Sequence, residues 1–430
     1  MGGRVLATGL AGMRGSWMIN LNVASQIDVR RKEIVVLLCI EEIFLMMGQS
    51  FLSPILPKFV QILGVDSNRI GMAIGFAITV FGIARVLMSI PAGKIAAHLG
   101  RRFLLVGAPA VVAISALGCA FTTEYWQLIV CRLLQGAGAA CFSIASLIVL
   151  GEISTPANRG LYISFFWITA LVGSSLGPTF GGLIGEYFGY KAVFFCYAAL
   201  SVMAVIWGYL RIPETSAHKT GSRSKESHKH GGRVDKASLL LSKNFILISL
   251  VSLFTMISVA GPQNTLVPLV GYESLSLRES QVGIGLTLIA IMQLILTPFA
   301  GKLSDRLGRK ILIVIGGVIS GLGLLMFTQS NTYLIFLISN MILGLGRGIG
   351  SSIPTAYVTD IGLKNNYEST IATFRAISDI GWVVGPFFCG YLMDIAGINL
   401  PFYLTTGMLI VVVVMFGLFG KETVVRVPGT

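Results

Sequence analysis

Ionisable side chains lie inside long apolar stretches of this 430-residue sequence, and their types could do chemistry. Glu41 and Glu42 stand in the first such stretch, and Arg375 and Asp379 stand four residues apart in a late one. Residues at this spacing share one face of a helix, so Arg375 and Asp379 can pair with each other or act together. A carboxyl group in such surroundings can bind a proton from one side of a barrier and release it to the other. The chemistry indicated is therefore proton exchange.

The proton-exchange candidates are Glu41, Glu42 and Asp379, because a charge inside a membrane costs a few kcal/mol and is retained mainly where it functions. Neighbours on a helix diverge by about 100°, so we expect one of the two glutamates to face a cavity and the other a helix seam. Pairing of Asp379 with Arg375 is the purely structural alternative.

Polar and aromatic side chains in the same stretches could bind a small molecule, because pockets combine an apolar lining with a few polar groups. Acids and aromatic rings would suit a lipophilic cation, whereas four arginines inside the stretches leave an anionic or zwitterionic substrate open. For each residue, hydrogen bonding between helices or plain packing is the competing interpretation. The candidate cavity residues are Gln49, Arg85, Gln135, Trp167, Asn264, Gln293, Asn340, Arg347, Tyr357, Arg375 and Trp382.

The elements that must position these residues are membrane-spanning helices. The chain is 54% apolar and 12% charged, whereas soluble domains carry about 25% charged residues. A membrane helix needs about 20 mostly apolar residues, and the runs are continuous, unlike the short alternating segments of a β-barrel. We predict twelve spans: 34–62, 70–96, 103–122, 126–150, 160–185, 190–211, 244–270, 280–300, 311–328, 333–358, 367–393 and 399–419.

The net charge of +13 does not indicate a nucleic-acid partner. With the amino end inside the cell, most Lys and Arg residues fall on the cytoplasmic side of the twelve spans, as the positive-inside bias requires. Anionic lipid headgroups then suffice as the partner of the basic loops. We expect a multi-pass protein of the cell membrane with both termini in the cytoplasm.

The chain repeats itself after 208 residues (301 − 93). The shift superimposes loop charges and Gly-Pro pairs, which apolar composition alone would not align. The matched pairs include Gly93 with Gly301, Arg101 with Arg309, Glu152 with Asp360, Gly177 with Gly385 and Pro178 with Pro386. Six helices per repeat is an even number, so both halves have the same orientation, with a site between them near mid-membrane.

This repeat predicts the domain organisation. We expect a cytoplasmic N-terminal segment at 1–33, a six-helix bundle at 34–212, a polar and basic cytoplasmic linker at 213–243, a second six-helix bundle at 244–420 and a cytoplasmic tail at 421–430. The linker is rich in Ser, Gly and His, a composition typical of a connector that does not pack.

Three motifs carry a family resemblance. They are GKLSDRLGRK from Gly301 to Lys310, RLLQGAGAA from Arg132 to Ala140, and GSSLGPTFGG from Gly173 to Gly182. Over about residues 30–422 the chain resembles the major facilitator superfamily, and the last motif is similar to that of twelve-span drug–proton antiporters. The resemblance implies an all-α integral membrane protein with twelve transmembrane helices in two parallel-repeat six-helix bundles. It also associates Arg132 with proton transfer.

The resemblance implies a secondary transporter that works by alternating access and exports small amphipathic or drug-like molecules against proton entry. The alternative is a uniporter or symporter of a sugar, an organic anion or a lipid-like solute. A non-transporting receptor or scaffold would be expected to lose the charges inside the membrane. We expect a small-molecule substrate, protons and membrane lipids as partners, no nucleic acid, and a monomeric state.

Gating is expected at the motif residues. In the family the carboxylate of the loop motif lies near the start of a helix in the opposite half, so Asp305 is expected to close the cytoplasmic side near Asn158–Gly160. The first copy of the loop has Ala97 at that position, so a symmetric closure is not expected. The gating and conformational residues are Gly93, Arg101, Gly173, Gly177, Pro178, Gly182, Gly301, Asp305, Arg306, Gly308, Arg309, Gly385 and Pro386.

We expect no enzyme, metal or cofactor. The formal GxSxG string in "GSSLG" falls inside a predicted membrane helix, whereas a hydrolase needs a strand–turn–helix and a catalytic His. The four His residues fall in predicted loops, and the six Cys residues are scattered without the spacing of a metal or disulfide framework.

Overall fold

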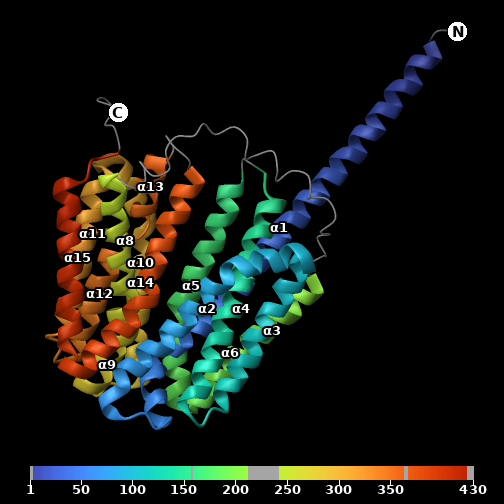
Figure 1. Ribbon diagram of the computed structural model, residues 1–430. Helices are drawn as coiled ribbons and strands as arrows, with labels where there is room; N and C mark the ends of the chain where they lie inside the picture. Colours follow the sequence, from blue (N-terminus) through green and yellow to red (C-terminus); the bar gives the residue numbers. More distant parts are fainter. Residues whose placement is uncertain (1–2, 156–157, 212–241, 363–366, 424–430) are drawn as a thin grey trace.

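The computed structural model describes residues 3–155, 158–211, 242–362 and 367–423, with side chains described from residue 31 and, after the last gap, from residue 370. All regular secondary structure in these ranges is helical, and the helices run roughly side by side (Figure 1).

The first six spans are single helices that follow one another closely. They are α1 (Gly3–Ile62), α2 (Ile70–Leu99), α3 (Arg101–Ala120), α4 (Tyr125–Ile153), α5 (Arg159–Phe188) and α6 (Tyr190–Arg211), with the short turn η1 (Ser67–Arg69) before α2. We call this set the N-half.

The next six spans form the C-half, in which two spans are broken. The seventh consists of α8 (Lys243–Ser258), η2 (Val259–Leu266), α9 (Val267–Leu269) and η3 (Val270–Ser274), and the tenth of α12 (Tyr333–Gly350) and α13 (Ile353–Gly362). The others are α10 (Glu279–Leu307), α11 (Arg309–Phe327), α14 (Tyr367–Ala396) and α15 (Asn399–Phe419).

Twelve helices of the described residues are long and apolar enough to cross a membrane, and the predicted fold class is confirmed. Large apolar side chains such as Leu87, Ile90, Ile114 and Phe299 are more than 60% exposed on the flanks, where lipid rather than water is the natural contact. Most helix ends lie within a few residues of the predicted spans. One difference from the predicted spans is that α1 already begins at Gly3, whereas its candidate membrane span covers only Arg31–Ile62.

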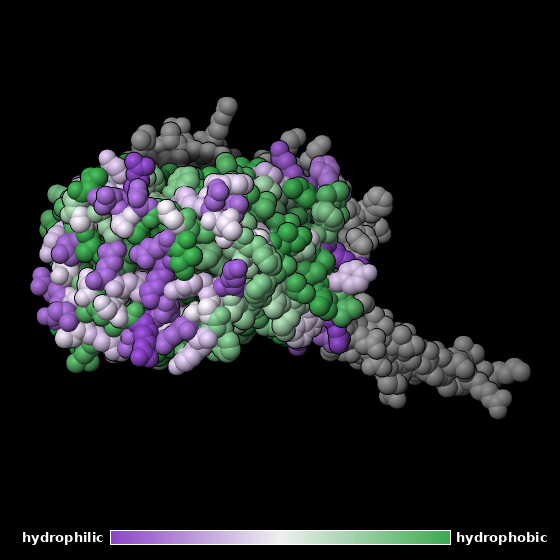
Figure 2. All heavy atoms as spheres, turned by 90° about the horizontal axis from the view of Figure 1, so that it is seen from below, coloured by the Kyte–Doolittle hydropathy of each residue, from purple (hydrophilic) through white to green (hydrophobic). Residues whose placement is uncertain are grey.

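The helices alternate in direction, so the molecule has two ends. The terminus side holds the ends of α6 at Arg211 and of α15 at Phe419, and the far side holds the ends of α1 at Ile62 and of α5 at Phe188. Figure 2 shows the far side, where hydrophilic side chains gather beside a broad hydrophobic flank. A polar end next to an apolar flank is the surface that a membrane-spanning bundle requires.

An ion pair on the terminus side recurs in both halves. Arg101 at the start of α3 donates to Glu152 in the last turn of α4 at 2.6 Å, and Arg309 at the start of α11 pairs with Asp360 of α13. The two pairs are related by the 208-residue shift (309 − 101). The repeat seen in the sequence is therefore a structural repeat, and these two arginines of the loop motifs hold helices together within a half.

The two halves meet along two helix seams, α2 with α14 and α5 with α10. The seams are also equivalent under the shift. A Cβ at Gly75 would lie 2.2 Å from the carbonyl oxygen of Pro386, and a Cβ at Gly283 would lie 2.2 Å from that of Pro178. Only glycine allows such an approach of two backbones. Both seams lie towards the far side, so the structure is closed there.

The domain bounds expected at residues 34, 212, 244 and 420 are not tested by the structure and stay a prediction. The expected linker, 213–243, lies outside the described residues apart from Ser242 and Lys243. The same holds for the expected tail, 421–430, beyond Thr423.

Candidate functional site

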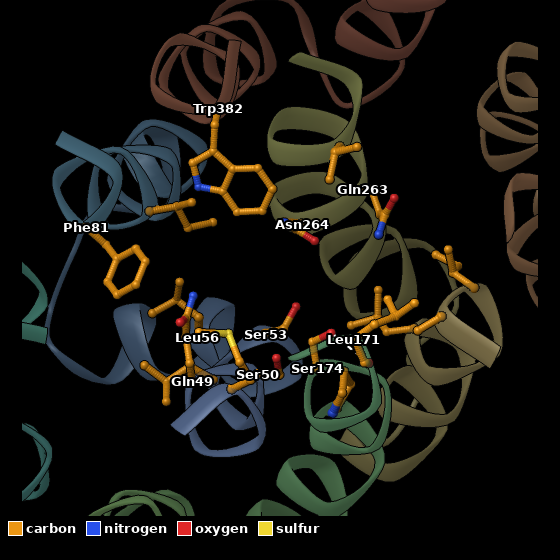
Figure 3. A pocket seen from close by; sticks show the side chains of 18 of the residues that line it. Gln49, Ser50, Ser53, Leu56, Phe81, Leu171, Ser174, Gln263, Asn264 and Trp382 are labelled. Carbon is orange, nitrogen blue, oxygen red and sulfur yellow. Dashed lines mark hydrogen bonds between the residues drawn. The ribbon is translucent and has the colours of Figure 1, made fainter. Parts of the chain in front are cut away.

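A central cavity of about 290 Å³ lies between the halves. In Figure 3 the side chains of Gln49, Ser50 and Ser53 from α1 lie on one side of it and Trp382 of α14 lies across from them. Arg85 and Phe81 of α2, Arg132 of α4 and Ser174 of α5 also line it from the N-half. The lining is mostly apolar with a few polar groups, as is usual for a small-molecule site.

The C-half lines the central cavity with the irregular part of its first span. Residues Val259–Leu266 form a π-helical turn, η2, that contains Pro262, which cannot donate a backbone hydrogen bond. Such wide turns often occur at functional sites because they re-aim side chains. Gln263 and Asn264 of this turn lie at the cavity wall (Figure 3). Gly261 allows the turn to pack against the backbone of Gly385.

A second cavity, of about 370 Å³, lies within the C-half between α8, α11, α12 and α14. We call it the C-half cavity. It shares Val259, Gln263, Gln293 and Trp382 with the central cavity, so the two adjoin. Its ionisable lining residues are Arg347, Arg375 and Asp379.

Arg132 is held firmly by its surroundings. It is 5% exposed, its Nε donates to the carbonyl oxygen of Ala77 at 3.3 Å, and its Nη1 donates to Gln135 at 3.0 Å. Its guanidinium carbon lies 4.7 Å from the ring centroid of Phe81, a distance that favours a cation–π contact. These contacts fix Arg132 at the edge of the central cavity.

Arg375 and Asp379 both line the C-half cavity but form no described ion pair with each other. Arg375 instead lies over the ring of Trp167, with its guanidinium carbon 5.6 Å from the ring centroid. Trp167 belongs to the N-half, so this contact crosses between the halves on the terminus side. The structural alternative raised from sequence, a pair within α14, is not formed in this conformation.

Glu41 and Glu42 are 0% and 1% exposed, and neither lines the two cavities. The expectation that one of them faces a cavity therefore differs from the structure. Both carboxylate oxygens of Glu41 and Oε2 of Glu42 have no hydrogen-bond partner among the described residues. A buried charged carboxylate without a partner is costly, so these two groups are well suited to carry a proton.

Three further candidates line neither cavity, and each uses a polar group in a contact between or within helices. Gln135 accepts from Arg132, and Asn340 donates to the carbonyl oxygen of Phe336 at 2.7 Å. Tyr357 is fully buried, and its hydroxyl donates to the backbone of Lys421 near the end of α15 at 2.5 Å. Trp167 lines neither cavity but contacts Arg375 at their edge.

The structure does place Gln49, Arg85, Asn264, Gln293, Arg347, Arg375 and Trp382 at a cavity. Sequence reasoning missed Ser50, Ser53 and Ser174, whose small hydroxyls are common in packed membrane helices and give no distinct signal. It also missed Gln263, for which the neighbouring Pro262 was the available signal.

The glycines of α5 and α14 serve two contacts. Gly173 and Gly177 pack against the backbone of α1 within the N-half, with added Cβ positions 2.6 Å from Ile43 and 2.7 Å from Met47 oxygen atoms. Gly385 packs in the same way against Ile257 of α8. Gly182, in contrast, faces α10 across the seam, where an added Cβ would lie 2.3 Å from the carbonyl oxygen of Glu279.

Carboxylates hold both seams at the far side. Asp394 at the end of α14 accepts the backbone N–H groups of Gly71 and Met72 at the start of α2, each at 2.8 Å. Glu186, its counterpart in α5, accepts the N–H of Ser280 at the start of α10 at 3.3 Å. A helix N-terminus attracts a negative charge, so each carboxylate joins one half to the other.

Asp305 lies at the opposite, terminus side and makes no described contact with the start of α5. Its side chain is 67% exposed and lies 3.6 Å from Arg309 of its own motif. Gly93 and Gly301 lie inside α2 and α10, and a Cβ added at either would meet nothing within 4 Å. The closure expected at Asp305 is thus not made in this conformation. Arg306 is exposed, and Gly308 lies against Glu422, which caps the start of α11.

The described residues contain no group of three or more metal-ligating side chains. What the arrangement can do is bind a small molecule between two halves that are closed on one side, next to groups able to exchange protons.

Comparison with known proteins gives a consistent result. A family model described as Major Facilitator Superfamily matches residues 38–276 and again residues 248–429. An uncharacterised MFS-type transporter of Methanocaldococcus jannaschii is 26% identical over 359 residues, covering 82% of this chain and 89% of that protein. The multi-drug resistance efflux pump PmrA of Streptococcus pneumoniae is 25% identical over 378 residues, covering 88% of this chain and 93% of the pump.

Among solved structures, a crystal structure of a D-xylose–proton symporter matches with a TM-score of 0.74 at 15% identity. The match covers 91% of this chain and 98% of the symporter. At this level of identity the likeness establishes the fold alone.

Proposed function

The chain belongs to the major facilitator superfamily, and from this premise we propose that it exports small amphipathic molecules in exchange for protons by alternating access. Members of this superfamily are membrane transporters and not enzymes. The similarity to a multi-drug efflux pump supports export. We place both termini in the cytoplasm, treat the chain as a monomer, and keep the two six-helix domains at 34–212 and 244–420.

One observation carries this proposal: a cavity lies between two equivalent halves, Asp379 lines the adjoining C-half cavity, and the buried Glu41 has no hydrogen-bond partner among the described residues. The central cavity is lined by both halves, and the seams that close the far side repeat with the 208-residue register (283 − 75). Two equivalent halves that meet at such seams can rock against each other, so that the two ends open in turn, as alternating access requires. Glu41, Glu42 and Asp379 are the groups proposed to carry protons, with Arg132 close to the cavity to modulate them.

The test is transport by the purified protein in liposomes. Vesicles loaded with a fluorescent amphipathic dye are given a pH gradient of either sign, and dye movement is followed over time. We expect a gradient to accelerate dye movement against the proton flow, and dye flux to move protons when the dye gradient is imposed alone. Equal rates with and without a gradient would contradict proton coupling and leave a uniporter.

A second candidate function is transport of an organic anion, and a specific observation favours it. The two cavities are lined by Arg85, Arg132, Arg347 and Arg375 but by a single acid, Asp379. An excess of cations attracts anions. In the same liposomes an anion symporter would carry its substrate with the proton flow rather than against it, so the direction of coupled movement separates the two functions.

A further inference from the structure

Arg347 is a buried cation whose charge nothing in the described structure balances. It is 4% exposed, forms no ion pair with the described carboxylates, and has no described partner for its Nε. Its Nη1 and Nη2 donate to the carbonyl oxygen of Thr255 at 3.2 Å and to the hydroxyl of Ser258 at 3.0 Å. Burying a charge without a counter-charge is unfavourable, so a residue of this kind needs an explanation.

Packing does not explain Arg347 as it explains Arg132. Arg132 uses its Nε on a backbone oxygen, rests on an aromatic ring and hydrogen-bonds a side-chain amide. Arg347 keeps its Nε unused and lines the C-half cavity. The 208-residue register gives Ala139 as its counterpart (347 − 139). The arginine is therefore specific to one half and is not a requirement of the repeated fold.

The C-half cavity adds two more charges to its lining, Arg375 and Asp379. These two are of opposite sign, so the uncompensated charge of the lining is that of Arg347. The guanidinium group presents several N–H donors in a planar fork that matches a carboxylate. The adjoining central cavity supplies apolar and aromatic surface at Phe81, Leu286 and Trp382.

We infer that the C-half cavity is a binding subsite for a carboxylate, with Arg347 as its anchor, and that the central cavity holds the apolar body of the same molecule. The substrate class is then an amphipathic organic acid or a zwitterion with a free carboxylate. The two cavities share Gln263, Gln293 and Trp382, so one molecule can extend from one into the other. This inference rests on the proposed transport function and specifies its substrate.

The experiment compares two probes of equal shape, 1-naphthoate and 1-naphthamide, by equilibrium dialysis against the purified protein in detergent. We expect the acid to bind at least about tenfold more tightly than the amide, which is the effect of one charge-assisted hydrogen bond. Arg347→Gln should remove that preference, and Arg347→Lys should keep part of it. Lys302→Gln, which removes an exposed cation outside both cavities, should leave the preference unchanged.

Several results would overturn the inference. They are equal binding of acid and amide by the wild-type protein, no binding of the acid, or an undiminished preference in a folded Arg347→Gln variant. A chloride titration distinguishes an inorganic anion from a substrate carboxylate. If chloride displaces naphthoate but not naphthamide, and the two probes bind equally tightly when chloride is absent, Arg347 holds an inorganic anion only. The wild-type comparison remains decisive if the variant does not fold.

Binding is measured without any gradient, so failure here is distinct from failure of the proposed function. A protein that binds naphthoate through Arg347 but ignores a pH gradient would keep the subsite and lose the proton coupling. A protein that exchanges a dye for protons but binds acid and amide equally would keep the proposed function and lose the subsite.

Discussion

At the scale of single residues, the carboxyl groups inside the membrane differ in their surroundings. Glu41 and Glu42 sit away from both cavities, buried and without described partners for most of their oxygens. Asp379 differs, because it lines the C-half cavity and is exposed within it. A proton on Glu41 or Glu42 removes a costly buried charge, and Asp379 can exchange its proton with the C-half cavity.

We expect Glu41→Gln, Glu42→Gln or Asp379→Asn to reduce gradient-driven transport to the rate seen without a gradient, because an amide cannot carry a proton. The rates are compared in liposomes with a pH gradient and at equal pH. Glu33→Gln, an exposed position at the terminus end of the same helix, is the control and should behave like the wild type. If all three substitutions leave the pH dependence intact, these carboxyls are not the coupling groups.

At the scale of elements, the seams between helices decide which end of the molecule is open. The N-half and the C-half approach through backbone atoms at Gly75 and Gly283, which have no side chain to keep the helices apart. Hydroxyl groups add to each seam, with Thr179 on Thr287 at 2.8 Å and Thr79 on the carbonyl oxygen of Val383 at 2.7 Å. These hydrogen bonds are few, and breaking and re-forming them costs little free energy, which suits a seam that must open.

We expect Gly283→Ala to open the far side, because its methyl group would lie 2.2 Å from the carbonyl oxygen of Pro178. Overpacking costs about 1–3 kcal/mol, enough to change a two-state population about tenfold. The distance between spin labels at Tyr187 and Ser274, near the far ends of α5 and η3, should increase. Gly107→Ala, where an added methyl meets nothing within 4 Å, should leave it unchanged; a seam that stays closed in Gly283→Ala would show that it is not a gate.

At the scale of the whole molecule, carboxylates lie at both ends in positions to bridge the halves. Asp394 makes its contact with the start of α2 in this structure, while Asp305 at the other end does not reach the start of α5 and is exposed. A molecule that opens its two ends in turn should make these contacts alternately. The structure is closed at the far side, as expected when Asp394 makes its contact and Asp305 does not.

We expect Asp394→Asn and Asp305→Asn to shift the molecule in opposite directions. Loss of a charge at a helix N-terminus costs about 0.3–2 kcal/mol, so Asp394→Asn should raise the fraction open at the far side. Asp305→Asn should raise the fraction open at the terminus side and depress transport while expression stays intact. Spin-label distances across each end measure both fractions.

The control for this pair is Asp66→Asn, which removes an exposed far-side carboxylate that makes no described ion pair. It should shift neither fraction. Normal transport by Asp305→Asn would remove Asp305 as a closing contact, and shifts of both variants in the same direction would contradict alternation between the two ends.

The sequence by itself determined the number of spans, most of their ends and the internal repeat. Apolar length is a local property, so α6 (Tyr190–Arg211) and α15 (Asn399–Phe419) begin and end where predicted. The repeat also aligned Arg101 with Arg309 and Glu152 with Asp360. The structure forms the two equivalent ion pairs, Arg101–Glu152 and Arg309–Asp360.

Only the tertiary structure decided which side chains reach a cavity. Gln135, Asn340 and Tyr357 had the right chemistry but turn into helix packing, while Gln263 enters the cavity through a π-helical turn that no span length reveals. The rotation of a helix about its axis, and the place where it forms a π-helical turn, depend on the neighbours that it packs against. A chain of apolar helices leaves that choice open until the neighbours are in place, because each helix has several apolar faces that could pack.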